Sequence, residues 1–145
     1  MVHDTSRFRP SFWAQVAPAA LYVALLFVGG SIPTPELPQG AVMPSDKLMH
    51  LLAFGGMQIL MFRAVRWSRL CAAPTAQNLL AAALSCAAGA LLEFWQAALP
   101  HRSAEFADWL ADSLGVLLGA LLLAVVTRSP GAVPAATSEP RERSR

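Results

Sequence analysis

Charge is scarce in this chain. Only 14% of its 145 residues are Asp, Glu, Lys or Arg, whereas a soluble domain carries about 25%. Hydrophobic residues make up 55% of the sequence. A water-soluble domain of this length exposes a large share of its residues and needs more polar surface than this composition supplies. The composition therefore excludes an ordinary soluble enzyme, and the high hydrophobicity excludes a disordered chain.

Cysteine and clustered basic residues are also rare. Cys71 and Cys86 lie in or beside apolar sequence and form no disulfide framework, so we expect free thiols. The Lys and Arg residues do not form one dense patch, which argues against nucleic acid as a partner. No glycine-rich phosphate loop, nucleophile elbow or Ser-His-Asp order is present in the sequence.

Long apolar runs account for most of the chain. A helix of about 20 apolar residues crosses the hydrocarbon core of a bilayer, which is about 30 Å thick. We therefore predict an all-α integral membrane bundle of four transmembrane helices in the lipid bilayer, at about residues 12–32, 48–67, 76–99 and 109–126. They form one transmembrane domain, residues 1–128. Residues 129–145 are rich in Pro, Ser and Arg and are expected to form a flexible cytoplasmic tail.

The first apolar run also allows a secretory signal peptide, because Arg7 and Arg9 precede it and small residues follow at 29–30. The run is longer than the apolar core of a typical signal, so a retained helix is favoured. Cleavage would leave the orientation of the other three helices unchanged.

The basic residues indicate the orientation in the membrane. With four spans, the N-terminal arm, the second loop and the C-terminal tail lie on one side, and they hold nine of the eleven Lys and Arg residues. The positive-inside rule places this side, with both termini, in the cytoplasm. The opposite side then carries two basic and six acidic residues.

Polar residues recur at helical spacing within three of the spans. An ionised carboxylate in hydrocarbon costs at least a few kcal/mol, so Glu93 and Asp112 should face the interior of the bundle and find partners there. Residues three or four apart share one face of a helix. The shared faces are Asp46, His50, Phe54 and Gln58 in the second span, Gly89, Glu93 and Gln96 in the third, and Asp108, Asp112, Gly115 and Gly119 in the fourth.

These faces converge on the outer side of the membrane, where we predict an outward-facing polar pocket. The alternative is a structural network, in which the polar groups pair with one another and fix helix packing. A pocket that also binds or transforms a molecule is favoured, because the ionisable groups outnumber what packing needs. Its predicted lining residues are Asp46, Lys47, His50, Glu93, Gln96, Arg102, Asp108 and Asp112.

Some of these side chains are potential metal ligands. His50, Glu93, Asp108 and Asp112 offer the atoms that divalent metals take. The sequence has no His-x-x-x-His or Cys pair to fix the geometry, so we expect neither a metal nor another cofactor.

The last three spans carry an ordered set of short motifs. They are Asp46-Lys47-Leu48-Met49-His50 with Ala53-Phe54, Glu93-Phe94-Trp95-Gln96, Arg102-Ser103, and Asp108-x-x-Ala111-Asp112-x-x-Gly115-x-x-x-Gly119. This combination, from about Met43 to Ala120, resembles the VanZ-like family of small bacterial membrane proteins. The chain departs from the family pattern at Leu51, where an aromatic is usual, and at Asp112, where Asn is frequent.

The resemblance implies a multi-pass protein of the bacterial cytoplasmic (inner) membrane that acts at the cell envelope. The namesake of the family contributes to low-level resistance to the glycopeptide antibiotic teicoplanin. The expected function is therefore binding of, or action on, a lipid-linked or amphiphilic envelope molecule, such as a glycopeptide-like ligand, with a contribution to teicoplanin tolerance.

Two other functions stay open at this point. One is a membrane-embedded hydrolase or transferase, with His50, Glu93 and Asp112 as catalytic candidates and Arg102 steadying an anionic group. The other is a proton-coupled transporter that uses Glu93 and Asp112 as relays. Four short spans would have to dimerise to enclose a path, so a homo-oligomer belongs among the expected partners.

Overall fold

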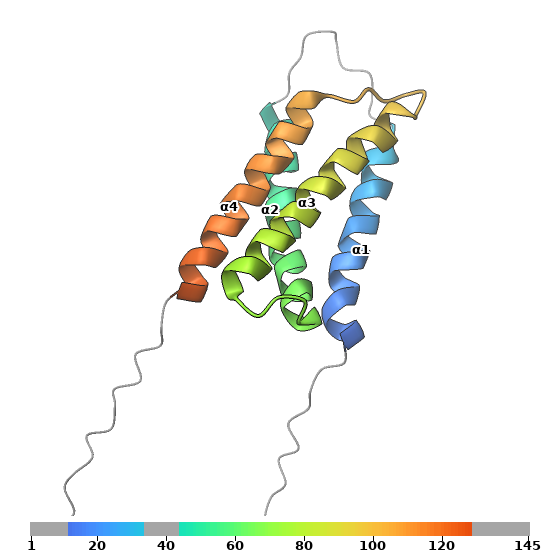
Figure 1. Cartoon of the computed structure of the whole chain (residues 1–145). Coiled ribbons are helices and arrows are strands. Elements are labelled where there is room, and N and C mark those ends of the chain that lie inside the picture. The colour runs from blue at the N-terminus through green and yellow to red at the C-terminus, as the bar shows by residue number, and fades with distance from the viewer. Residues whose placement is uncertain (1–11, 34–43, 129–145) are drawn as a thin grey trace, which may run out of the picture.

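The computed structural model describes residues 12–33 and 44–128, and these form helices without any strand. Four antiparallel helices follow one another up and down the bundle (Figure 1). They are α1 (Phe12–Ser31), α2 (Pro44–Ser68), α3 (Pro74–Ala97) and α4 (Phe106–Arg128). The predicted all-α bundle is thus confirmed, whereas the predicted tail at 129–145 lies outside the described residues.

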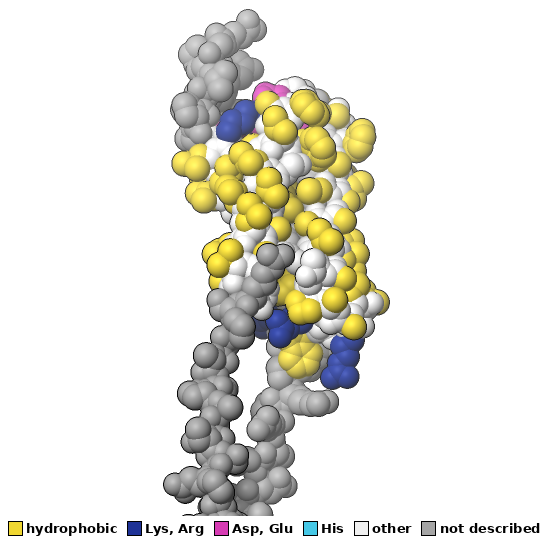
Figure 2. Space-filling view, turned by 60° about the vertical axis from the view of Figure 1, so that its left-hand side comes forward, with side chains coloured by type: hydrophobic (Ala, Val, Ile, Leu, Met, Phe, Trp, Pro, Cys, Tyr) yellow, Lys and Arg dark blue, Asp and Glu magenta, His cyan; other side chains and the backbone are white. Residues whose placement is uncertain are grey.

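The surface of the bundle is that of a membrane protein. All four helices are long and apolar enough to cross a bilayer. Large apolar side chains such as Leu21 and Leu25 on α1 and Leu121 and Val125 on α4 are exposed. Figure 2 shows a broad hydrophobic band between the two ends where charged side chains appear. Soluble monomers rarely expose an apolar surface of this extent, so the chain is a multi-pass membrane protein.

α2 and α4 begin earlier than the apolar runs suggest, whereas α1 begins where it was predicted. α2 starts at Pro44 instead of 48, and α4 starts at Phe106 instead of 109. Proline suits a first helical turn, where its missing N–H would have no partner. Asp46 and Asp108 lie in the first turns of their helices, at the positive end of the helix dipole. Asp46 and Asp108 therefore lie within helices and not in loops.

α2 is the central helix of the bundle. It packs against the other three helices, as α3 also does, and its contact with α4 is the most extensive in the bundle, whereas α1 contacts α2 and α3 but, in the described part of the chain, not α4. The buried core consists of Phe54, Met57, Leu92 and Val116, with a second buried group nearer the α2–α3 loop formed by Phe62, Val65 and Ala81.

Glycines allow α2 and α4 to approach closely. A Cβ atom on Gly115 would collide with the carbonyl oxygen of Leu51. A Cβ atom on Gly119 would lie 3.0 Å from the carbonyl oxygen of Gly55. Small residues serve this purpose at helix interfaces in membranes, where packing cannot rely on the hydrophobic effect. This contact fixes the register of α4 on α2.

A polar network ties three helices together in the interior. Gln58 Nε2 donates to Asn78 Oδ1 at 2.9 Å, and Ser85 Oγ donates to Gln58 Oε1 at 3.2 Å. Asn78 Nδ2 in turn donates to the carbonyl oxygen of Ala120 at 2.9 Å. Gln58 and Ser85 are fully buried, and their hydrogen bonds offset the cost of burying polar groups.

The substitution Gly115→Ala should destabilise the bundle by about 1–3 kcal/mol, the usual cost of overpacking a filled interface. The collision involves backbone, which cannot move aside as a flexible side chain would. Gly29→Ala is the matched control, because no described atom lies within 4 Å of a Cβ there. Reversible unfolding in mixed micelles measures both variants, and equal stabilities would show that the close α2–α4 contact does not support the fold.

Candidate functional site

Three helices bring ionisable side chains to one end of the bundle. The starts of α2 and α4 and the end of α3 meet there because the helices alternate in direction (Figure 1). We call the resulting group the acidic cluster; it comprises Asp46, Lys47, His50, Glu93, Glu105, Asp108 and Asp112.

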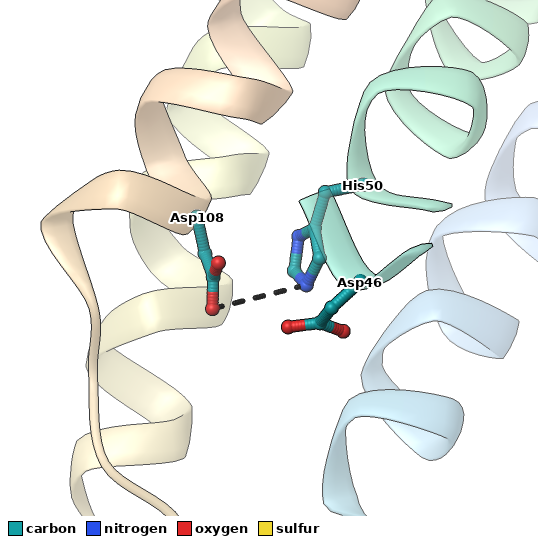
Figure 3. Close-up of side chains that lie close together, drawn as sticks. All are labelled: Asp46, His50 and Asp108. Carbon is teal, nitrogen blue, oxygen red and sulfur yellow. Dashed lines mark ion pairs between the residues drawn. The ribbon is translucent and has the colours of Figure 1, made fainter. Parts of the chain in front are cut away.

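His50 lies at the centre of the acidic cluster. Its Nδ1–H donates to Asp112 Oδ1 at 2.9 Å, and Asp112 is fully buried. On the other edge of the ring, Nε2 lies 3.9 Å from Asp108 Oδ2. Figure 3 shows Asp46 and Asp108 directed toward this edge from α2 and α4. A carboxylate bonded to one ring nitrogen fixes the orientation of the imidazole and leaves the second nitrogen available.

Lys47 forms the rim of the acidic cluster. Its ammonium group pairs with Asp108 Oδ1 and, at 3.0 Å, with Glu105 Oε2. Lys47 is partly exposed and Glu105 is exposed, whereas Asp108 is buried. The cluster therefore meets solvent through Lys47, Glu105 and the exposed Asp46, and becomes buried toward Asp112.

Glu93 connects the end of α3 to the start of α4. Its Oε2 accepts the backbone N–H of Glu105 at 2.9 Å, and the Glu105 carbonyl accepts the N–H of Asp108 at 2.9 Å. This hydrogen bond positions the first turn of α4. The second oxygen, Glu93 Oε1, is buried and has no hydrogen-bond partner among the described residues, and the same is true of Asp112 Oδ2.

Negative charge predominates in the acidic cluster. Five carboxylates face one Lys and one His, so three negative charges remain when every group is ionised. Uncompensated charge at the end of a membrane bundle is costly, and in membrane proteins it marks sites that bind or move something.

Gln96 and Arg102, two of the eight predicted pocket residues, lie elsewhere. Gln96 Nε2 donates to the carbonyl oxygen of Gly30 at 3.3 Å, and an Arg102 guanidinium N–H donates to that of Ile32 at 3.1 Å. His101 Nε2 likewise contacts the carbonyl oxygen of Ser31 at 2.9 Å. These side chains satisfy carbonyl groups at the end of α1, and the structure gives Gln96 and Arg102 no hydrogen bond to the other six predicted residues among those described.

An apolar hollow lies between α1 and α3 at the same end of the bundle as the acidic cluster. Phe27, Val28, Ser31 and Trp95 line it, and it opens to the surface between α1 and α3 with a volume of about 510 Å³. Trp95 Nε1 donates to Ser31 Oγ at 2.8 Å, which holds the indole against α1. Indole rings favour the membrane interface, where one edge is apolar and the other is hydrated.

Sequence reasoning missed Glu105 and the apolar hollow. Glu105 lies three residues before Asp108, at helical spacing, but it precedes α4 and stood outside the predicted span, which was expected to begin at residue 109. Its presence among the six acids on the predicted outer side was the available signal.

Comparison with known proteins agrees with the resemblance carried by the motifs. Residues 6–127 match the family described as VanZ/LLP1, which covers most of the chain and includes all four helices. No curated protein and no solved structure matches the chain.

A double-mutant cycle tests the buried contact of the site. Combining His50→Ala with Asp112→Ala should give a coupling energy of about 1–3 kcal/mol, because both groups are largely removed from water. The matched cycle of Lys47→Ala with Glu105→Ala should give less than about 1 kcal/mol, because this pair is exposed. Unfolding of the purified variants supplies both values, and a larger coupling at the rim than in the interior would contradict this ranking.

Proposed function

The chain belongs to the VanZ/LLP1 family, and from that premise we propose that it binds a lipid-linked or amphiphilic molecule of the bacterial cell envelope. The observation that carries the proposal is the acidic cluster, a polar and largely negative group at one end of a bundle whose surface is otherwise apolar. A packing spacer has no need of five carboxylates in one place. An amphiphile carries a polar part and an apolar part, and this end of the molecule offers a surface for each.

The polar part of the ligand meets the acidic cluster. The cluster is rich in acceptors and poor in donors, so it suits a ligand that presents ammonium, amide N–H or hydroxyl groups. Asp46 is exposed and Lys47 partly so, which leaves the rim accessible. A glycopeptide has donors of this kind, and this supports a contribution to teicoplanin tolerance.

The apolar part of the ligand lies against the hollow of Phe27, Val28, Ser31 and Trp95. This hollow is open to the lipid-facing side, so an acyl chain can enter it from the bilayer without leaving the apolar phase. Its position at the same end as the acidic cluster lets one molecule contact both.

In this proposal the acidic cluster faces outward from the bacterial inner membrane, with both termini in the cytoplasm. Nine of the eleven Lys and Arg residues belong to the arm, the α2–α3 loop region and the tail. The helix ends next to those segments, namely the start of α1 and the ends of α2 and α4, lie at the end of the bundle opposite to the acidic cluster (Figure 1). The positive-inside rule supports this orientation.

A second candidate function is a hydrolase or transferase acting on the same class of molecule. The hydrogen bond between His50 Nδ1 and the buried Asp112 favours it, because a carboxylate-oriented imidazole is a common general base. In such a reaction His50 Nε2 takes the proton of a water or hydroxyl group that attacks the ligand, and Asp112 stabilises the resulting imidazolium. The imidazolium then returns this proton to the leaving group as its bond to the ligand breaks.

The orientation can be measured with single thiols. In a chain with Cys71 and Cys86 replaced by Ser, the substitution Ser103→Cys should react with an impermeant maleimide on intact cells, because it lies on the acidic-cluster side. Thr75→Cys, exposed at the start of α3, should react only after the cells are permeabilised. The reverse pattern would place the acidic cluster in the cytoplasm and would exclude a ligand from the outer leaflet.

Ligand binding can be measured with teicoplanin itself. The native chain in nanodiscs should bind it, and Asp112→Asn should bind it about tenfold more weakly, as expected for the loss of a hydrogen bond to a charged group. Glu139→Gln, a carboxylate of the tail, is the matched control and should bind normally. Mass spectrometry of the recovered teicoplanin separates the two candidate functions, since a binder leaves it unchanged and an enzyme converts it in a His50-dependent way.

Deletion of the gene should lower teicoplanin tolerance several-fold. Re-expression of the native chain or of Glu139→Gln should restore it, and Asp112→Asn should not. Unchanged tolerance after deletion, together with no binding to the native chain, would refute teicoplanin as a ligand.

A further inference from the structure

The deepest part of the acidic cluster draws metal-ligating side chains from three different helices. His50 of α2, Glu93 of α3 and Asp112 of α4 each present one ligand atom, and these atoms all lie within 4.8 Å of one another. We infer that these three residues form a binding site for a divalent transition-metal ion. The sequence predicted no metal, because these three residues are far apart along the chain and form no short ligand motif.

Two buried oxygens without partners point to a missing ligand. Glu93 is 8% exposed and Asp112 is 0% exposed. Glu93 Oε1 and Asp112 Oδ2 lack a hydrogen-bond partner among the described residues, although the other oxygen of each carboxylate has one. A buried carboxylate oxygen without a donor is costly, and a cation that both oxygens coordinate removes this cost.

Space for the Asp112 carboxylate comes from Gly89 on α3. A Cβ atom at Gly89 would lie 3.2 Å from Asp112 Oδ2, closer than an ordinary contact. Glu93 follows Gly89 by one helical turn, so it projects from the same face of α3. The two carboxylates thus meet at the junction of three helices.

The charge of the three groups suits a divalent ion. Two carboxylates and a neutral imidazole carry two negative charges, which a divalent cation neutralises. Lys47 does not neutralise the charge of Glu93 and Asp112, because its ammonium pairs with Asp108 and Glu105 at the rim. A neutral assembly is far less costly to bury than two carboxylates whose negative charge is not neutralised.

The donor set favours zinc. One imidazole nitrogen and two carboxylate oxygens are common ligands of Zn²⁺, and a water can complete a tetrahedral site. The 2.9 Å between His50 Nδ1 and Asp112 Oδ1 is near the spacing of neighbouring ligands, so the ion can bind Nδ1 of the neutral tautomer that carries its proton on Nε2. Asp46 and Asp108 face the other edge of the ring (Figure 3), and carboxylates in that place orient metal-bound imidazoles.

The test uses the full-length protein, stripped of metal and titrated with Zn²⁺ alone, so it does not depend on an amphiphile. The native chain should bind one Zn²⁺ per chain by calorimetry. Glu93→Gln and Asp112→Asn should each weaken binding by about 100-fold or more, beyond the 10–100-fold expected for a residue that only supports a ligand. The control Glu139→Gln removes a carboxylate outside the acidic cluster and should bind like the native chain.

A second measurement uses only the native chain, so its result does not depend on whether the variants fold. Co²⁺ added to the native chain should give the visible absorption of an imidazole-bound ion, and Zn²⁺ should abolish it. Absence of both Zn²⁺ and Co²⁺ binding to the native chain would overturn the inference. So would loss of binding in Asp46→Asn with normal binding in Glu93→Gln, because the ligands would then be Asp46, His50 and Asp108.

Discussion

The close contact between α2 and α4 determines where every group of the site lies. Helix axes in proteins are usually 8–10 Å apart, a distance set by the side chains between them. Here Gly115 and Gly119 leave the backbone of α2 directly against α4. Because Leu51 is fixed against Gly115, the neighbouring His50 must lie beside Asp112, one turn earlier on α4. The apolar packing of the bundle thereby sets the geometry of its most polar residues.

The architecture and much of the acidic cluster could be predicted from the sequence. The length of the apolar runs identifies the helices, since few other structures can hold 20 apolar residues in lipid. Helical spacing puts His50, Glu93, Asp108 and Asp112 on faces that turn toward the other helices, with Asp46 one turn before His50, and alternation of direction brings those faces to one end. Helix starts were less predictable, because Pro44 and Phe106 precede the apolar runs that hydropathy detects.

The other features at this end of the bundle depend on contacts that leave no pattern in the sequence. Gln96 shares a face with Glu93, yet its partner is a backbone carbonyl of α1, and every residue has such a carbonyl. Arg102 lies in a loop, whose course decides whether it reaches the acids or the end of α1. The hollow around Trp95 exists only because α1 packs on α3. Spacing within one helix cannot predict how a second helix is placed against it.

The way α1 ends has a consequence for the order of membrane assembly. Its final carbonyl groups, from Gly30 to Ile32, are satisfied by Gln96, His101 and Arg102, about 70 residues later in the chain. During synthesis those donors emerge only after α2 and α3 have been made. Until then the end of α1 must stay hydrated at the membrane surface. The rest of α1 can pack on α2 as soon as α2 is made, whereas the last carbonyl groups of α1 find their partners only when the loop before α4 has been made.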